Sequence, residues 1–295
     1  MCVKEGMMYV LFADTDEEIT PEIAKKYGYN LISMPYSIDG KEIYPYEDFD
    51  VFDYRGFYSR LRSGATPKTS GLSPEKYIGY FEPFFKEGKD ILYVHFSSAM
   101  SGTFSAMNIA YDELKAKYPE RTLYLLDTKA ISIGSLNILE EIGDMYLRGA
   151  TVEEILKWGE TEIYKFAVYF FAEDLSFFRR SGRVSGITAF MGNLLGIKPI
   201  INMAEDGIMK SVDKARGKRG VLAKILNYVE DLQEDIAAHR VIITHADAEE
   251  SARLLGDMLK EKYPNVNIEY LVVNPTAGSH CGPDCVGVSF HAKHR

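Results

Sequence analysis

The sequence contains little cysteine. Its 295 residues include three, Cys2, Cys281 and Cys285, and an odd, sparse count argues against a disulfide framework and favours a reducing compartment. His280 beside Cys281 adds another possible metal ligand to the same segment. A structural zinc site would need a fourth ligand, and this spacing matches no common zinc pattern. We therefore predict no metal site.

Long apolar runs are also absent. No stretch approaches the roughly 20 apolar residues that a membrane-spanning helix requires, and residues 1–6 lack the apolar core of a signal peptide. The sequence also shows no linker, repeat or low-complexity segment. Together with the scarce cysteine, these absences predict a cytoplasmic protein.

A basic excess is missing as well. The chain has 34 Lys and Arg residues against 43 Asp and Glu residues, a formal net charge of -9, whereas nucleic-acid binders normally carry a basic excess or stripe. The densest basic run, Lys214, Arg216, Lys218 and Arg219, is short. It is either a solvated helix end or a patch for a partner or an anion. We therefore predict that the protein binds no nucleic acid.

Apolar and aromatic residues, in contrast, are plentiful. The chain is 46% hydrophobic, 26% charged and 13% aromatic, with 20 Tyr and 16 Phe. This composition is typical of a globular protein. It supplies a large core and leaves apolar surface that could line a ligand cavity.

Short apolar strands alternate with helical patterns through the first half of the chain. Strands are expected at residues 9–13, 31–37, 90–96 and 122–126, and helices over 104–117, 133–147 and after the capping signals at Thr20, Ser73 and Thr151. Repeated alternation of this kind is typical of a mostly parallel sheet flanked by helices. We therefore predict an N-terminal α/β lobe over residues 1–162.

The second half mixes strands, helices and a hairpin. We expect a strand at 164–171, a helix capped by Ser185 and running to Leu195, a hairpin turn at Asp206–Gly207, helices over 217–233 and 248–262, strands at 240–244 and 267–273, and a Gly-rich turn at 278–283 leading into a last strand. These elements predict a mixed α/β lobe over residues 163–295. The fold class is therefore α/β with two lobes.

Polar residues follow several predicted strands. Ligands of open parallel sheets bind beyond the carboxyl ends of the strands, and those ends carry small hydroxyl or acidic residues at Asp14–Thr15, Ser97–Ser98, Asp127–Thr128 and Thr244–His245. After the second of these, Gly102 lets a ligand approach the backbone. Ser101, Thr103 and the first helical N–H groups would then face a carboxylate or a phosphate. The alternative is that Ser101 merely caps the helix.

Known nucleotide and hydrolase motifs do not fit this turn. It has neither the lysine of a phosphate-binding loop nor a Gly-x-Gly-x-x-Gly fingerprint. A nucleophilic serine would sit in a Gly-x-Ser-x-Gly elbow, and the residue two before Ser101 is Ala99. The alternative function is an enzyme that uses Ser101, either a serine acyl hydrolase or another small-molecule enzyme. His280 or His245 could serve as the base of the hydrolase only through tertiary contact.

Three other segments carry side chains that could bind an anion. Thr69 could donate to an anion from a hydroxyl-rich loop, or that loop could be plain polar surface. His280 could hydrogen-bond or pair with a carboxylate, or it could be a structural histidine bonded to backbone. Arg179, Arg180 and Arg183 flank a glycine turn, where they could clamp an anion or stay solvated.

Taken together and in this order, these segments resemble the DegV family of bacterial fatty-acid-binding proteins. The matching blocks are Pro67–Pro74, Ser97–Thr103, Phe177–Ser185 continued by Gly192–Ile200, Lys214–Gly217, and Gly278–Pro283. Each block alone is a weak signal, but their ordered occurrence is specific. The resemblance runs from residue 9 to residue 290.

The resemblance implies a fatty-acid carrier with one acyl chain bound between or within its two lobes. Carried over to this sequence, the residues that hold the acyl carboxylate are Thr69 and Ser101, with Ser98 nearby and His280 completing the polar end. A buried carboxylate must be hydrogen-bonded, and hydroxyls with helix N–H groups supply such bonds without a fixed countercharge.

The resemblance also implies a partner. Family members present the carboxyl group of the fatty acid to a separate kinase, which makes the acyl phosphate for phospholipid synthesis. Arg183 and Arg216 would then position the polar end or contact that kinase. On this interpretation the protein has no catalytic residue of its own and no cofactor apart from the bound fatty acid, and it touches a membrane surface transiently for lipid exchange.

The sequence departs from the family pattern at several positions. Ala13–Asp16 replaces Thr-Asp-Ser-Thr, Gly71–Leu72 replaces Gln-Pro, and Ser181 replaces a glycine. None of these changes removes a proposed carboxylate ligand. They do not determine which acyl chain length the protein prefers or which kinase it pairs with.

Overall fold

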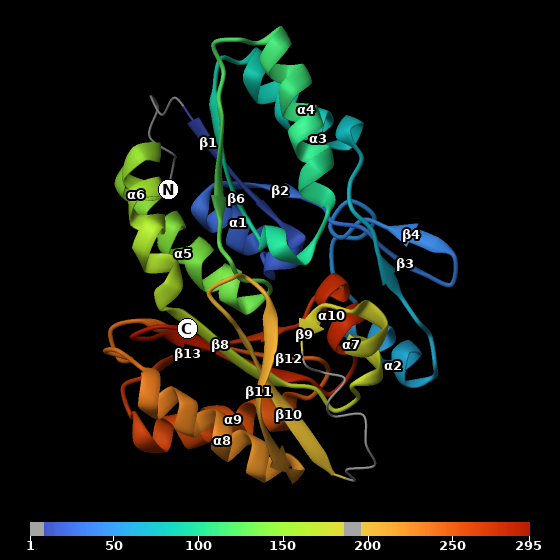
Figure 1. Ribbon diagram of the computed structural model, residues 1–295, viewed down its shortest axis with the longest axis vertical. Helices are drawn as coiled ribbons and strands as arrows, with labels where there is room; N and C mark the ends of the chain where they lie inside the picture. The colour runs from blue at the N-terminus through green and yellow to red at the C-terminus, as the bar shows by residue number, and fades with distance from the viewer. Residues whose placement is uncertain (1–8, 186–195) are drawn as a thin grey trace.

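Two β-sheets organise the chain in the computed structural model, which describes residues 9–185 and 196–295 (Figure 1). The first sheet has the order β2-β1-β6-β7, and all its strands are parallel. Its strands are β1 (Tyr9–Asp14), β2 (Tyr29–Ile32), β6 (Asp90–His95) and β7 (Leu123–Asp127). This arrangement confirms the parallel sheet predicted from the alternation of strands and helices.

Helices cover both faces of the first sheet. They are α1 (Pro21–Tyr27), α3 (Pro74–Lys86), α4 (Thr103–Lys117), α5 (Ile133–Arg148) and α6 (Val152–Glu162). α3 and α4 pack together on one side, and α1 and α5 contact each other on the other side (Figure 1). The predicted caps hold: the Thr20 side chain accepts from Ile23 N, and Thr151 forms a capping box with Glu154.

A small third sheet departs from the prediction of one strand over residues 31–37. β2 ends at Ile32, and β3 (Tyr36–Ile38) starts a new sheet with β4 (Lys41–Ile43) and β5 (Lys68–Thr69). The single predicted strand is wrong because Pro35 has no N–H to continue a ladder. In addition, Met34 N donates to Thr15 Oγ1 (2.9 Å), so this N–H is not available for a hydrogen bond between strands. A short helix, α2 (Tyr54–Arg62), lies between β4 and β5.

The second sheet contains both parallel and antiparallel pairs, in the half of the chain that was predicted to form a mixed α/β lobe. Its order is β13-β12-β14-β8-β10-β11-β9. The strands are β8 (Phe166–Phe171), β9 (Val184–Ser185), β10 (Ile197–Met203), β11 (Met209–Arg216), β12 (Arg240–His245), β13 (Asn267–Val272) and β14 (Val286–His291). β12–β13 and β11–β9 are parallel pairs and the other neighbours are antiparallel. β10 and β11 form the hairpin predicted around Gly207, whose φ is +78°.

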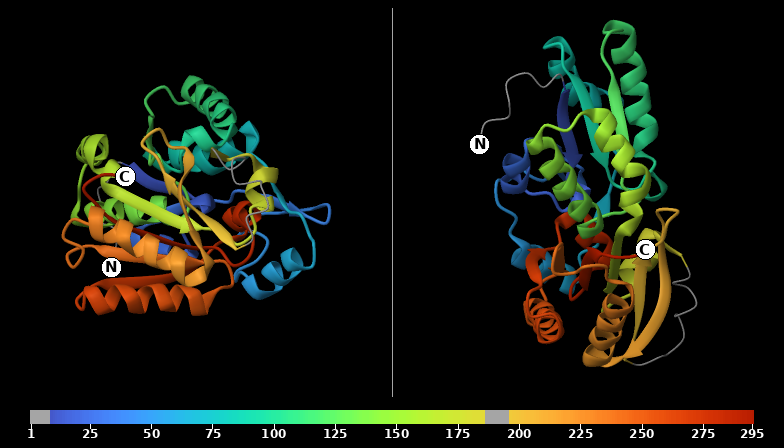
Figure 2. Two further views of the ribbon diagram at one scale, coloured as in Figure 1. Left: turned by 60° about the horizontal axis from the view of Figure 1, so that its bottom comes forward. Right: turned by 90° about the vertical axis from the view of Figure 1, so that its left-hand side faces the viewer.

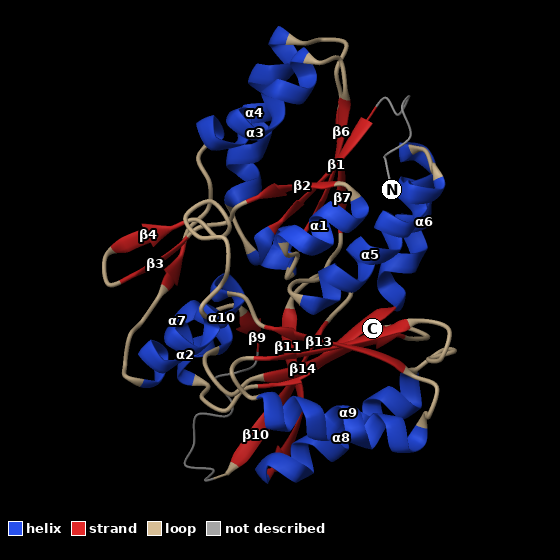
Figure 3. Cartoon of the chain, turned by 180° about the vertical axis from the view of Figure 1, so that it is seen from behind, coloured by secondary structure: helices blue, strands red, loops and turns tan. Residues whose placement is uncertain are grey.

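α5 lies between the two sheets (Figure 2). It contacts β8, β12 and β14 of the second sheet, while α8 (Gly217–Leu232) and α9 (Glu249–Lys262) lie side by side on the opposite face of that sheet (Figure 3). Two glycines permit the close approach. A Cβ at Gly134 would lie 2.5 Å from Val168 Cγ2, and one at Gly143 would lie 2.5 Å from the Tyr27 ring. α5 therefore packs against both halves of the molecule.

Two short helices complete the described chain. α7 (Ser176–Ser181) precedes β9, and α10 (Pro275–Cys281) precedes β14. The segment predicted as a Gly-rich turn is thus partly helical, and it turns only at Gly282. The helix expected between Ser185 and Leu195 lies outside the described residues. The division into lobes at residues 162 and 163 stays a prediction.

Candidate functional site

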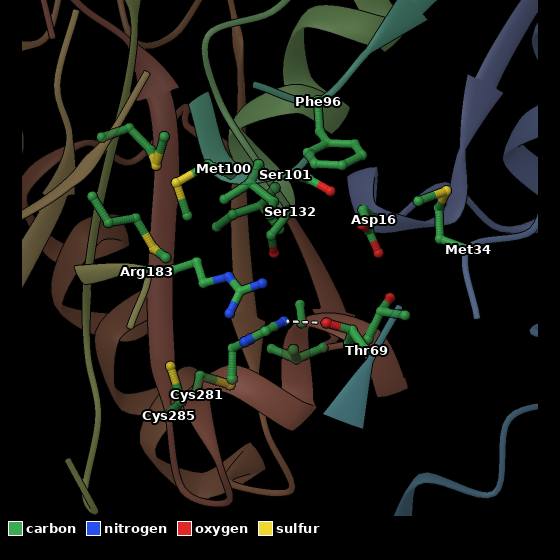
Figure 4. Close-up of a pocket in the computed structure, with 18 of the residues that line it drawn as sticks. Asp16, Met34, Thr69, Phe96, Met100, Ser101, Ser132, Arg183, Cys281 and Cys285 are labelled. Atoms are coloured by element: carbon green, nitrogen blue, oxygen red, sulfur yellow. Dashed lines mark hydrogen bonds between the residues drawn. The ribbon is translucent and has the colours of Figure 1, made fainter. Parts of the chain in front are cut away.

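A pocket lies where the first sheet, β5, α10 and the second sheet meet (Figure 4). Its apolar lining includes Met34, Phe96, Met100, Ile131, Ile133, Val168, Phe170, Phe178, Met203, Met209 and Val273. Its polar lining includes Asp16, Thr69, Ser70, Ser101, Ser132, Arg183, Thr244, Thr276 and His280. An apolar cavity with a few convergent polar groups is typical of a small-molecule site.

Thr69 and His280 meet in this pocket. Thr69 ends β5 and pairs with Tyr36 of β3, so its position is fixed by the third sheet. His280 lies on α10, whose first turn is capped by the Asn274 side chain accepting from Ala277 N (2.8 Å). The two side chains share a hydrogen bond of 2.9 Å between Thr69 Oγ1 and His280 Nε2. The structure thus brings together two residues that the sequence singled out separately.

His280 is neutral in this environment. Burial, together with the positive charge of Arg183, lowers the pKa of His280 to about 4. Its Nδ1 is buried and has no hydrogen-bond partner among the described residues. A buried N–H without an acceptor is rarer than an unpaired acceptor atom, so we assign the ring proton to Nε2. Nε2 then donates to Thr69 Oγ1, which leaves the Thr69 hydroxyl proton free to donate into the pocket.

Ser101 combines the two roles that the sequence left open. It follows a short 3-10 turn over Ser98–Met100 and adopts an extended conformation before α4. Its Oγ accepts from Thr103 N (3.2 Å), and its side chain lines the pocket. Because the hydroxyl only accepts in that bond, its own proton is available for a ligand.

Thr103 and Ser98 lie outside the pocket. The expectation that Thr103 faces a ligand is wrong, because this residue is buried and its Oγ1 accepts from Leu72 N (3.1 Å) and bonds to the Tyr77 hydroxyl (2.9 Å). Ser98 is exposed, and its hydroxyl donates to Asp127 Oδ2 (2.5 Å). The structure therefore does not place Ser98 with Thr69, Ser101 and His280.

The two predicted arginines are separated. Arg183 lines the pocket, and Figure 4 shows its guanidinium between Ser132 and Thr69. Arg216 lies at the end of β11, is exposed, and is not among the residues that line the pocket. Of these two arginines, only Arg183 therefore brings a positive charge to the polar groups of the pocket.

His280 and His245, the two possible bases of a serine hydrolase, do not contact Ser101 in the described structure. His280 bonds to Thr69, and His245 Nδ1 accepts from Ala248 N (3.2 Å). A serine nucleophile needs an adjacent base within hydrogen-bond reach. Neither histidine therefore provides a base for Ser101 in the described structure.

Sequence reasoning missed several pocket residues. Asp16 follows β1 in a 3-10 turn (Thr15–Glu17), and its side chain lines the pocket. In the sequence, the departure of Ala13–Asp16 from the family pattern is the feature that could have indicated Asp16.

Cys281 and Cys285 also line the pocket and are buried. Contact with the Cys285 thiol, together with burial, raises the pKa of Cys281.

The match to a family model covers nearly the whole chain. The model is that of DegV, described as an uncharacterised protein of the DegV family, and it matches residues 9–293. A DegV domain-containing protein of Clostridium perfringens is 31% identical over 282 residues, which cover 96% of this chain and 97% of that protein. The chain belongs to the DegV family.

Solved DegV structures share this fold. A DegV lipid-binding protein of Thermotoga maritima has a TM-score of 0.81 at 24% identity, covering 98% of this chain and 100% of that one. DegV of Bacillus subtilis, a fatty-acid-binding protein, has a TM-score of 0.82 at 23% identity, with the same shares covered. These likenesses confirm the α/β fold class, with its parallel sheet and its second, mixed sheet.

In residues 9–185 and 196–295, no group of three or more His, Cys, Asp or Glu side chains could hold a metal ion. None of the helices that the structure describes is both long enough and apolar enough to span a bilayer.

Proposed function

We propose that this DegV chain binds a long-chain fatty acid in the pocket and presents its carboxyl group to a separate fatty-acid kinase. The observation that carries the proposal is the composition of the pocket. Apolar side chains line most of it, while the Thr69 and Ser101 hydroxyls, His280 and Arg183 gather at one end. The Thermotoga maritima relative binds lipid and the Bacillus subtilis relative binds fatty acid.

The polar end suits a carboxylate. Thr69 and Ser101 each keep a hydroxyl proton that no other group requires. A carboxylate accepts such protons, and charged acceptors form the stronger hydrogen bonds. Arg183 offsets the charge of the ligand. Neutral His280 holds the Thr69 oxygen and so directs its hydroxyl toward the ligand.

The apolar part supplies the affinity. Burying one CH2 group contributes about 0.8 kcal/mol, so a chain of some 15 carbons supports tight binding even after the entropy lost on association. Side chains such as Met100, Phe170 and Met209 would contact the chain. Methionine adapts its shape easily, which suits a flexible acyl ligand.

Presentation to a kinase is the finer part of the proposal and draws on the family resemblance. Arg183 lines the pocket and is exposed, so it can contact both the ligand and a partner. Exposed Arg216 belongs to the same proposed partner surface. The protein itself would hold the substrate, and the kinase would supply ATP and the catalytic groups. Because Ser98 donates to Asp127, it is left out of the proposed carboxylate ligands.

Native mass spectrometry of the purified protein tests the binding step. We expect a bound mass of roughly 250–290 Da, the size of a common fatty acid with a chain of this length. Repeated absence of lipid, with no uptake of added palmitate or oleate, would overturn the proposal. Acyl phosphate should form from ATP only when a fatty-acid kinase subunit is added. Labelling of Ser101 by a fluorophosphonate, with ester turnover by the protein alone, would establish the serine hydrolase instead.

A further inference from the structure

Asp16 places a carboxyl group in the polar end of the pocket (Figure 4). Its Oδ1 is buried and has no hydrogen-bond partner among the residues that the structure describes. The backbone around it is fixed, because Asp16 N donates to Asp14 Oδ1 (3.0 Å) and Asp16 O accepts from Ser132 N (2.9 Å). The Asp16 side chain is therefore held in the pocket that Thr69 and Ser101 also line.

No cation is paired with this carboxyl group in the described structure. Its own segment contributes three further buried carboxyl groups, on Asp14, Glu17 and Glu18. Neutral His280 on α10 and Arg183 line the same pocket, and the ion pairs of the described residues include none between Arg183 and Asp16. Burial raises the pKa of Asp16 to about 6, and the nearby Thr276 hydroxyl opposes this rise.

Thr276 offers Asp16 little stabilisation as a donor, because its hydroxyl donates to Asn274 Oδ1 (2.7 Å). An ionised Asp16 would thus be a buried charge with neither a countercharge nor a donor for Oδ1, which is strongly unfavourable. A protonated Asp16 is uncharged and also offers an O–H. The pocket then contains three hydroxyl donors for one carboxylate ligand, on Asp16, Thr69 and Ser101.

We propose that Asp16 is a ligand-binding residue that donates a hydrogen bond to the carboxylate of the fatty acid, so that an Asp16 that is ionised in the free protein takes up one proton when the ligand binds. This inference rests on the proposed function and adds to it a residue and a pH dependence. The approach of a second carboxylate disfavours ionisation of the first, so the ligand strengthens the hold of Asp16 on its proton. The pair shares one proton, as carboxyl groups in contact do.

Fatty-acid affinity as a function of pH tests this inference. Binding of palmitate is measured at pH 6.5, 7.5 and 8.5 by displacement of a fluorescent fatty acid from the wild type, from Asp16→Asn and from Asp257→Asn. Asp257 is an exposed carboxylate on α9, outside the pocket lining, and controls for the change in net charge. For the wild type and Asp257→Asn we expect Kd to rise about tenfold per pH unit, as uptake of one proton requires.

For Asp16→Asn we expect a Kd that is constant over this range, because an amide donates without titrating. Calorimetry in buffers of different ionisation enthalpy should find about one proton taken up per ligand at pH 7.5 by the wild type and none by the variant. Asp16→Thr, a neutral donor, should behave like Asp16→Asn. Thermal melts confirm that both variants fold.

The outcomes separate the two proposals. A wild-type Kd that does not change with pH, or an Asp16→Asn variant that keeps the wild-type slope, would overturn the role of Asp16 and leave fatty-acid binding intact. Failure of the wild-type protein to bind palmitate at any pH would overturn the proposed function itself.

Discussion

Thr69 and His280 lie 211 positions apart in the sequence and share a hydrogen bond of 2.9 Å. The bond joins the last residue of β5 to α10, so it ties the small third sheet to the end of the chain. Since His280 is neutral and donates from Nε2, the Thr69 oxygen is occupied while its proton is free. A single contact therefore sets both the position and the donor direction of a proposed ligand-binding hydroxyl.

Removal of the Thr69 or Ser101 hydroxyl should weaken fatty-acid binding. Each lost hydrogen-bond partner leaves a buried carboxylate less satisfied, at about 1–3 kcal/mol, so Thr69→Val and Ser101→Ala should each raise Kd roughly 10- to 100-fold. Ser105→Ala, an exposed hydroxyl on α4, is the matched control. Ser98→Ala should keep wild-type affinity, since Ser98 bonds to Asp127; a loss comparable to that of Ser101→Ala would restore the sequence-based assignment.

His280 should remain neutral down to unusually low pH. Its pKa of about 4 means that the ring gains a proton only well below the value of about 6.5 for a solvated histidine. Nitrogen-15 spectra of the imidazoles, with the His280 signals assigned by comparison with His280→Gln, should show one neutral tautomer with its proton on Nε2 between pH 5.5 and 8. A titration centred near pH 6.5, or a proton on Nδ1, would contradict the assigned hydrogen bond.

Stability should decrease as pH rises from about 5 to 8. Burial, together with the neighbouring carboxyl groups, raises the pKa values of Asp14 and Glu17, and burial raises that of Glu18 to about 8. The folded state therefore binds more protons than the unfolded state in this range, and the free energy of unfolding falls with pH. At about 1.4 kcal/mol per pKa unit, the loss should reach a few kcal/mol in urea unfolding.

The variant Glu17→Gln tests the source of this pH dependence. Glu17 is fully buried and one of its oxygens has no partner among the described residues, so an amide should mimic the protonated acid and reduce the slope. Glu261→Gln, on the exposed side of α9, should leave the slope unchanged. Stability that is constant or rises between pH 5 and 8 in the wild type would refute the prediction.

A side chain at Gly282 should loosen the packing of α10 on α7. Gly282 has a φ of +72°, and a Cβ there would lie 2.4 Å from the Phe177 ring. Gly64 has a φ of +98° with no atom within 4 Å of its Cβ position, so it reports the cost of a side chain at positive φ without a steric contact. We expect Gly64→Ala to lower the free energy of unfolding by about 1–2 kcal/mol and Gly282→Ala by a further 1–3 kcal/mol or so. Equal losses in denaturant titrations would show that the Phe177 contact is unimportant.

The sequence by itself determined the local structure and the kind of chemistry. Hydrophobic periodicity and capping residues predicted most helices and strands of the described chain, because these signals act over a few residues. The hairpin at Gly207 and the caps at Thr20 and Thr151 are examples. The ordered blocks of hydroxyl-bearing turns identified the family. Local reasoning was wrong at residues 31–37, where Pro35 ends the strand and the next residues join another sheet.

Only the tertiary structure decided which polar side chains meet. Ser98 and Ser101 are near neighbours in the same turn, yet one donates to Asp127 at the surface and the other lines the pocket. Thr69 and His280 are 211 positions apart and share a hydrogen bond. Asp16 became a candidate ligand-binding residue because the surrounding contacts leave its buried oxygen without a partner. These relationships depend on contacts between elements that are distant in sequence, and no local pattern of residues encodes them.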